Sequence, residues 1–162
     1  MHYAATIAGM SFANAFLGLC HSMAHKLGAM YNIPHGVANA LLIRQIIKYN
    51  STDKPAKQAI FPQYKYPNAK TKYGQIADEL NLGGKNDDEK VKLLIKAVDK
   101  LMTEIQLPKS IKDIGVKKAD FMKNLDTLVE RAFDDQCTGA NPRYPLMEEI
   151  KQIFLDAYEG KV

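Results

Sequence analysis

Three of the four histidines in this chain fall close together in sequence, at His21, His25 and His35. His21 and His25 are four residues apart, so on a helix their rings leave the same face, one turn apart. His35 follows an Asn-Ile-Pro segment, and a turn there can bring the chain back toward that face. Neutral imidazole binds iron, zinc and copper through one ring nitrogen, so this pattern favours part of a transition-metal site.

The residues around these histidines offer no carboxylate. Residues 1–52 contain no Asp or Glu, and their charged residues are Lys26, Arg44 and Lys48. A metal ion held by imidazoles alone would lack a neutralising charge and a fourth ligand. Either the histidines are ordinary hydrogen-bonded core residues, or the missing ligands come from elsewhere. The glutamate base of the zinc-protease motif is absent, because residue 22 is serine.

A second candidate segment is 134–145, with the sequence DDQCTGANPRYP. Its composition is typical of a helix end followed by turns. Cys137 could act as a nucleophile, but no histidine neighbours it in sequence, which favours a small packing residue. Asp134 and Asp135 could bind a metal, although neighbours on a helix point about 100° apart and rarely chelate together.

Length and composition indicate one globular domain. The 162 residues are 46% hydrophobic and 25% charged, and the net charge of +4 comes without an arginine cluster, so we expect no nucleic-acid partner. Two cysteines do not make a disulfide framework and favour a reducing, cytoplasmic setting. The uncharged stretch 3–20 is too rich in small and polar residues for a membrane span and has no basic region before it, so we expect neither a membrane contact nor a signal peptide.

The hydrophobic pattern predicts an all-α fold, a compact domain of about six or seven helices. We expect the first helix from about residue 3 to 28, stopped by Gly28, with Gly18 as the place for a break. Because this stretch is uncharged and rich in small residues, we expect it to be buried on all sides. The second helix begins near His35 and is also expected in the interior. Further helices are expected at 67–80, 87–105, 117–133 and 146–158, with a turn-like element at 110–114 and a surface excursion at 50–67.

Several long motifs of this chain resemble those of the iron-dependent, group III alcohol dehydrogenases. They are AGMSFANAFLG at 8–18, HSMAH at 21–25 and IPHGVANA at 33–40. FPQY at 61–64, the residues 69–73 and 76–78, and FDDQCTGANPRYP at 133–145 resemble more narrowly the bifunctional aldehyde-alcohol dehydrogenases. The resemblance covers essentially the whole chain.

This resemblance implies a helical metal-binding and catalytic domain, residues 1–162, that faces a dinucleotide-binding domain across a cleft. It implies hydride transfer between NAD(H) and a short-chain aldehyde or alcohol, with acetaldehyde and ethanol as the expected pair. The family metal, Fe(II) or in some members Zn(II), is held by one Asp and three His, and two of these match His21 and His35. His25 matches a residue beside the nicotinamide that assists proton handling, which makes it the expected catalytic and cofactor-binding residue. Phe12, Leu17 and Cys137 match positions that line the substrate pocket.

The resemblance also implies what lies outside this chain. The aspartate and first histidine of the metal set, and the dinucleotide-binding domain, are expected upstream of Met1. We therefore expect the domain to be absent here and the chain alone to have little or no dehydrogenase activity. Full-length relatives form homo-oligomers and filaments, so one alternative is a non-catalytic helical assembly module that keeps the histidines passively. Another is part of a single-function diol or butanol dehydrogenase.

Overall fold

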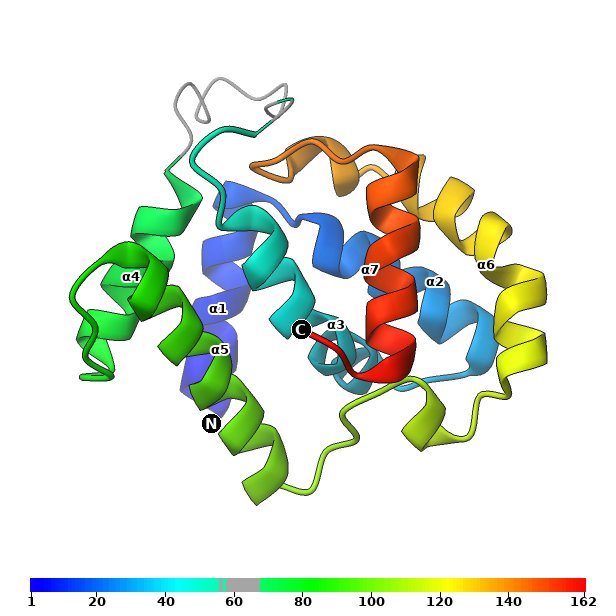
Figure 1. The fold of residues 1–162 in the computed structure, drawn as a ribbon, viewed down its shortest axis with the longest axis horizontal. Coiled ribbons are helices and arrows are strands. Elements are labelled where there is room, and N and C mark those ends of the chain that lie inside the picture. Colours follow the sequence, from blue (N-terminus) through cyan, green and yellow to red (C-terminus); the bar gives the residue numbers. More distant parts are fainter. Residues whose placement is uncertain (56, 58–67) are drawn as a thin grey trace.

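The computed structural model of the protein describes residues 1–55, 57 and 68–162. The described residues form helices and no strand, which confirms the all-α prediction (Figure 1). The α-helices are α1 (His2–Ala15), α2 (Leu19–Tyr31), α3 (His35–Asn50), α4 (Ala69–Glu79), α5 (Asp87–Glu104), α6 (Lys118–Phe133) and α7 (Met147–Glu159), and the short 3-10 helices are η2 (Lys112–Ile114) and η3 (Thr138–Ala140). Most of the surface excursion expected at 50–67, and all of the motif at 61–64, lie outside the described residues.

Helices α2, α3, α6 and α7 enclose the main hydrophobic core. α2 packs against α3 and α6, and α7 packs against the same two helices. Leu27, Leu41, Phe121 and Phe154, one from each helix, are fully buried in this core. Each such side chain stabilises the fold by about 1.5–3 kcal/mol relative to its exposed state. Because α2 is held on two sides, the direction of its polar face is fixed.

A second, smaller core joins α4 and α5 to α3. It is made by Ile47, Ala77, Val91 and Leu94, which are all buried. Beside it, the buried Arg44 of α3 forms an ion pair with Asp99 of α5 and donates to the backbone oxygen of Lys109. The pKa of Asp99 is lowered, first by the Lys109 ammonium and further by Arg44, although burial acts in the opposite direction. These contacts attach the α4–α5 pair to the rest of the molecule.

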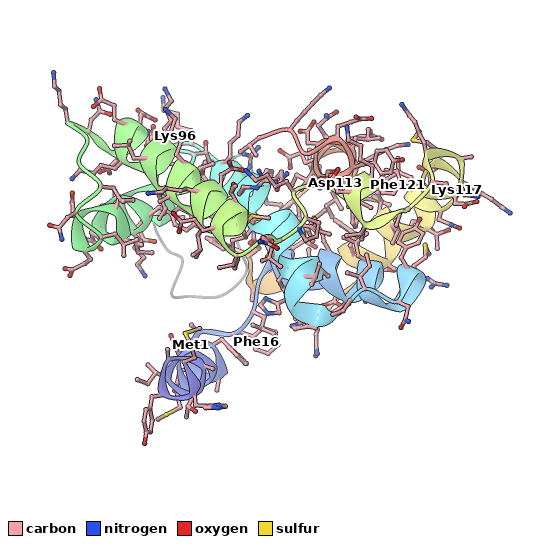
Figure 2. The ribbon with its side chains drawn as sticks, turned by 90° about the horizontal axis from the view of Figure 1, so that it is seen from below. Met1, Phe16, Lys96, Asp113, Lys117 and Phe121 are labelled. Atoms are coloured by element: carbon pink, nitrogen blue, oxygen red, sulfur yellow. The ribbon has the colours of Figure 1, made fainter. Side chains whose placement is uncertain are left out.

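Helix α1 does not lie in the interior, which corrects the expectation from sequence. None of its residues is buried, and Tyr3 and Met10 expose 87% and 64% of their surface. Figure 2 shows this helix, with Met1 at its start, standing apart from the other helices. An apolar helix is buried only where another apolar surface faces it, and among the described residues no element packs along α1.

The break expected near Gly18 is present. Phe16 has a left-handed φ of 66°, and its N–H donates to the Phe12 oxygen at 2.7 Å, which ends α1. Gly18 is extended and precedes the first residue of α2. No single described helix is long and apolar enough to cross a membrane, and α1 and α2 meet that test of length and composition only as a pair bent by 112°.

Helix α2 does not stop at Gly28, which corrects a second expectation. It continues to Tyr31, because Asn32 takes the left-handed φ of 53° that ends it. Gly28 instead allows the chain to return closely, since a Cβ there would lie 3.2 Å from the Ile33 oxygen. The returning segment starts α3 at His35, as the sequence predicts.

Candidate metal and proton-transfer site

The start of α2 is held by Asn141, a buried residue that directly follows η3. Asn141 Oδ1 accepts the backbone N–H of Leu19, the first residue of α2, at 3.2 Å. This bond satisfies one of the N–H groups that a helix start leaves without an intrahelical partner. Gly18 comes so close that a Cβ there would lie 2.9 Å from Asn141 Oδ1. The segment after α6 therefore sets the position of α2, and with it the positions of His21 and His25.

The rings of the three clustered histidines lie together. The distance between ring centroids is 5.3 Å for His21 and His35, 5.6 Å for His25 and His35, and 6.0 Å for His21 and His25. His35 reaches the pair because α3 starts immediately after the turn and packs against α2. The prediction that the third histidine returns to the face of the first two is confirmed.

The surroundings of His21 and His35 determine how these two rings could bind a metal. Burial, and then the nearby His35 and His25, lower the pKa of His21, so this ring is neutral at neutral pH. Asn39 Nδ2 lies 3.1 Å from His35 Nε2, and an amide nitrogen only donates, so this ring nitrogen is unprotonated and accepts the Asn39 N–H, which a metal bound to Nε2 would have to displace. Neutral imidazole is the form that a metal binds. His21 and His35 thus fit half of a four-ligand site, and the other half has to come from other residues.

Asp135, which follows α6, faces His25 across the site. Its Oδ2 lies 3.5 Å from His25 Nδ1 and 2.8 Å from Lys26 Nζ, and its Oδ1 accepts the Cys137 N–H at 2.9 Å. Burial alone would raise the pKa of Asp135, but the bonds from Lys26 and Cys137 outweigh it and lower this pKa to about 2. A carboxylate therefore faces His25 at neutral pH. Sequence reasoning gave Asp134 and Asp135 equal weight and did not find this contact.

His25, Asp135 and Cys137 also bring one potential ligand atom each to within 4.8 Å of one another. Two features oppose a metal ion at these three residues. Burial, with a smaller effect of Asp135, raises the pKa of the Cys137 thiol to about 11, so the sulfur is protonated at neutral pH. The Lys26 ammonium already occupies the carboxylate. The arrangement is better suited to orienting an imidazole than to binding a metal.

The structure places two of the three predicted substrate-pocket residues at the histidine cluster. The Phe12 ring, at the exposed end of α1, has its centroid 6.4 Å from that of His21. Cys137, which is buried, lies beside Asp135. Leu17 is half-buried in the connection between α1 and α2. Residues from both ends of the chain thus meet at one place, while their roles toward a substrate stay predictions.

Comparison with known proteins identifies the family to which this fold belongs. Residues 1–158 match the model of the Fe-containing alcohol dehydrogenase family, C-terminal, so the chain belongs to that family. Its fold is similar to a solved structure of a 1,3-propanediol oxidoreductase, with a TM-score of 0.78 and 33% sequence identity. That match covers 96% of this chain and 36% of the solved chain.

Within this family, bifunctional enzymes are among the similar relatives. The chain is 56% identical, over 163 residues, to the bifunctional aldehyde-alcohol dehydrogenase of Escherichia coli strain K12, covering 99% of this chain and 18% of that protein. It is 55% identical, over 159 residues, to the aldehyde-alcohol dehydrogenase of Clostridium acetobutylicum, covering 98% of this chain and again 18% of the relative. The chain thus spans less than a fifth of the length of these curated relatives.

Proposed function

We propose that this chain is the part of an aldehyde-alcohol dehydrogenase that supplies two metal ligands, a proton-handling histidine and one wall of the substrate pocket. The proposal is carried by the convergence of His21 and His25, on α2, with His35 at the start of α3. The reaction proposed is the NAD(H)-linked interconversion of acetaldehyde and ethanol. The identities of 56% and 55% to the two aldehyde-alcohol dehydrogenases, against 33% to the 1,3-propanediol oxidoreductase, support it over a diol or butanol dehydrogenase.

In this proposal His21 and His35 hold Fe(II), or Zn(II) in its place, through their unprotonated ring nitrogens. A bound divalent ion supplies Lewis-acid polarisation of a carbonyl oxygen. His25, one helical turn from His21, holds the proton that is exchanged with the alcohol oxygen and lies beside the nicotinamide. The apolar side chains proposed to exclude water from the site are Phe12, Leu17 and Cys137.

The remaining parts of the site come from outside these 162 residues in our proposal. An aspartate and a third histidine complete the metal set, and a dinucleotide-binding domain holds NAD(H). We also propose a homo-oligomer or filament, because the exposed apolar side chains of α1 need a covering surface. A cytoplasmic location is consistent with two cysteines that are both free.

The same exposed helix favours one competing function, a non-catalytic assembly module. Binding of Zn(II) and, without oxygen, of Fe(II) to the purified chain separates the two functions. We expect His21→Ala and His35→Ala each to weaken binding by roughly tenfold or more, because each removes one ligand. His2→Ala, at the exposed start of α1, is the matched control and should bind like the unchanged chain. Equal affinities of all four proteins would favour the assembly module.

Activity is tested in a chimera in which this chain replaces the corresponding segment of the E. coli relative. We expect the chimera to reduce acetaldehyde with NADH, and His21→Ala or His35→Ala to abolish that activity. His25→Ala should lower kcat by roughly 100-fold or more, the range of one general acid–base group, while metal content stays unchanged. A metal-loaded chimera in which His25→Ala keeps full kcat would refute the role of His25.

A further inference from the structure

Asp135 and His25 lie face to face although 110 positions separate them in sequence, Asp135 just after α6 and His25 in the middle of α2. We propose that Asp135 is a positioning residue that holds His25 with its proton on Nδ1 and leaves Nε2 as the nitrogen that exchanges a proton. The meaning of this proposal for catalysis rests on the proposed function. The orientation itself is a property of this chain and can be tested without the reaction.

The carboxylate of Asp135 is fixed from two sides. Its Oδ1 accepts the backbone N–H of Cys137 at 2.9 Å, and its Oδ2 accepts from Lys26 Nζ at 2.8 Å. The Asp135 side chain is only 9% exposed, so little water competes for its oxygens. The backbone bond belongs to the turn that leads into η3, and η3 packs against α2 (Figure 1). The position of Asp135 is therefore set by the fold and not by His25.

This fixed acceptor selects one form of the imidazole. The 3.5 Å between Asp135 Oδ2 and His25 Nδ1 is longer than an ordinary N–H···O hydrogen bond, but the negative carboxylate still favours a proton on this facing nitrogen over a lone pair. The neutral ring then carries its lone pair on Nε2, away from Asp135. The His25 side chain is 37% exposed, so the ring as a whole is accessible from solvent. A histidine oriented by a carboxylate is a common arrangement for a general base.

Metal binding by His25, Asp135 and Cys137 is the competing use of these residues. It would require Lys26 to leave the carboxylate and the buried thiol to lose its proton. Both changes are unnecessary if Asp135 only orients the ring. Zn(II) chelation by these three residues is therefore made one outcome of the experiment.

The experiment measures the ring 15N chemical shifts of His25 in the uniformly labelled chain, with EDTA present, at about pH 8.5, where free imidazole is neutral. We expect the Nδ1–H tautomer to predominate in the unchanged chain. In Asp135→Asn the amide presents an N–H to the ring in place of an acceptor, so we expect the ratio of tautomers to move toward Nε2–H by roughly tenfold.

Two matched variants separate positioning from stability and from net charge. Lys26→Met removes the same ion pair as Asp135→Asn but keeps the carboxylate, so we expect the tautomer ratio to stay as in the unchanged chain. Asp134→Asn removes an equal charge from the neighbouring exposed residue and should also leave the ratio unchanged. Together these variants test whether the carboxylate itself selects the tautomer.

Three results would overturn the proposal. One is an Nε2–H ring in the unchanged chain. Another is an equal change of the ratio in Asp135→Asn and Lys26→Met. The third is a shift of the His25 nitrogens when Zn(II) is added to a second sample without EDTA, if Cys137→Ala abolishes that shift. Failure here is distinguishable from failure of the proposed function, because that function is tested by the metal ligands His21 and His35. A tautomer set by Asp135 in the chain, together with a chimera that does not reduce acetaldehyde, would support the orientation and refute the function.

Discussion

Asn50 and Asn141 exchange two side-chain hydrogen bonds in the interior of the molecule. Asn141 Nδ2 donates to Asn50 Oδ1 at 2.8 Å, and Asn50 Nδ2 donates to Asn141 Oδ1 at 3.3 Å. The same Asn141 accepts the Leu19 N–H and donates to the Arg143 oxygen. One buried amide therefore ties together the end of α3, the start of α2 and the segment after η3, which are the parts that place the histidine cluster.

The substitution Asn141→Ala should be strongly destabilising. It leaves the Leu19 N–H and the Asn50 amide buried without this partner, so we expect the free energy of unfolding to fall by about 2–4 kcal/mol. Asn14→Ala is the control, because Asn14 is exposed and makes one local bond to the Met10 oxygen. It should change stability by less than about 0.5 kcal/mol. Urea unfolding followed by circular dichroism measures both, and equal losses would contradict the role of Asn141.

A methyl group at Gly18 should also be destabilising, although the backbone there is extended and allows any residue. The new Cβ would lie 2.9 Å from Asn141 Oδ1, which is held by its own hydrogen bonds and cannot move aside freely. We expect Gly18→Ala to lower the free energy of unfolding by about 1–3 kcal/mol. Gly36→Ala is the matched control, because nothing lies within 4 Å of a Cβ on this glycine of α3.

Gly36→Ala should raise the free energy of unfolding, the opposite of the effect expected for Gly18→Ala. Alanine is favoured over glycine within a helix, so Gly36→Ala should stabilise the chain by about 0.5–1 kcal/mol. The pair is compared by thermal and urea unfolding under one set of conditions. A stabilising Gly18→Ala would mean that the close approach to Asn141 is not required.

The helices were predictable from sequence because their apolar residues recur with helical spacing. The starts of α3, α5 and α6 lie within about one residue of the predicted positions, since prolines, turn residues and acidic first turns mark them locally. The exposure of α1 was not predictable, because the burial of a helix depends on a facing surface that its own sequence does not encode. The contact of Asp135 with His25 was equally hidden, since no local pattern reports a pair joined by the packing of α2 and α6.

The ion pair of Asp135 should make stability depend on pH. The pKa of this carboxyl is lowered from 3.8 to about 2 in the folded chain, so the folded state binds this proton less readily than the unfolded state. The resulting stabilisation is complete above about pH 5 and is lost as the pH falls to 2. We expect the free energy of unfolding of the unchanged chain to exceed that of Asp135→Asn by about 1–2 kcal/mol at pH 7, and this difference to vanish near pH 2.

Thermal unfolding between pH 2 and 7 tests this dependence. Asp134→Asn is the control for the loss of one acidic charge, because Asp134 is exposed. The difference in stability between Asp134→Asn and the unchanged chain should stay nearly constant between pH 2 and 7. A constant difference for Asp135→Asn as well would show that the bonds to Lys26 and Cys137 do not favour the ionised carboxylate in solution.

His21 should titrate below the usual histidine range, and its neighbours should account for part of this. Burial lowers its pKa first, and the charges of His35 and His25 lower it further. We expect His35→Ala to raise the pKa of His21, measured by NMR titration, but to leave it below about 6.5, the unperturbed value, because burial remains. His2→Ala should leave it unchanged, since that residue lies at the exposed start of α1.

The sign of this shift also sets how acid affects the fold. Because the folded pKa of His21 is the lower one, the unfolded chain takes up this proton first, and stability falls as the pH drops below about 6.5. Replacing His21 with Gln removes the titrating group, so the unfolding free energy should fall less steeply between pH 6.5 and 5. A steeper fall in the variant, or a measured His21 pKa above about 6.5, would mean that burial and the neighbouring rings do not lower the pKa of His21 in solution.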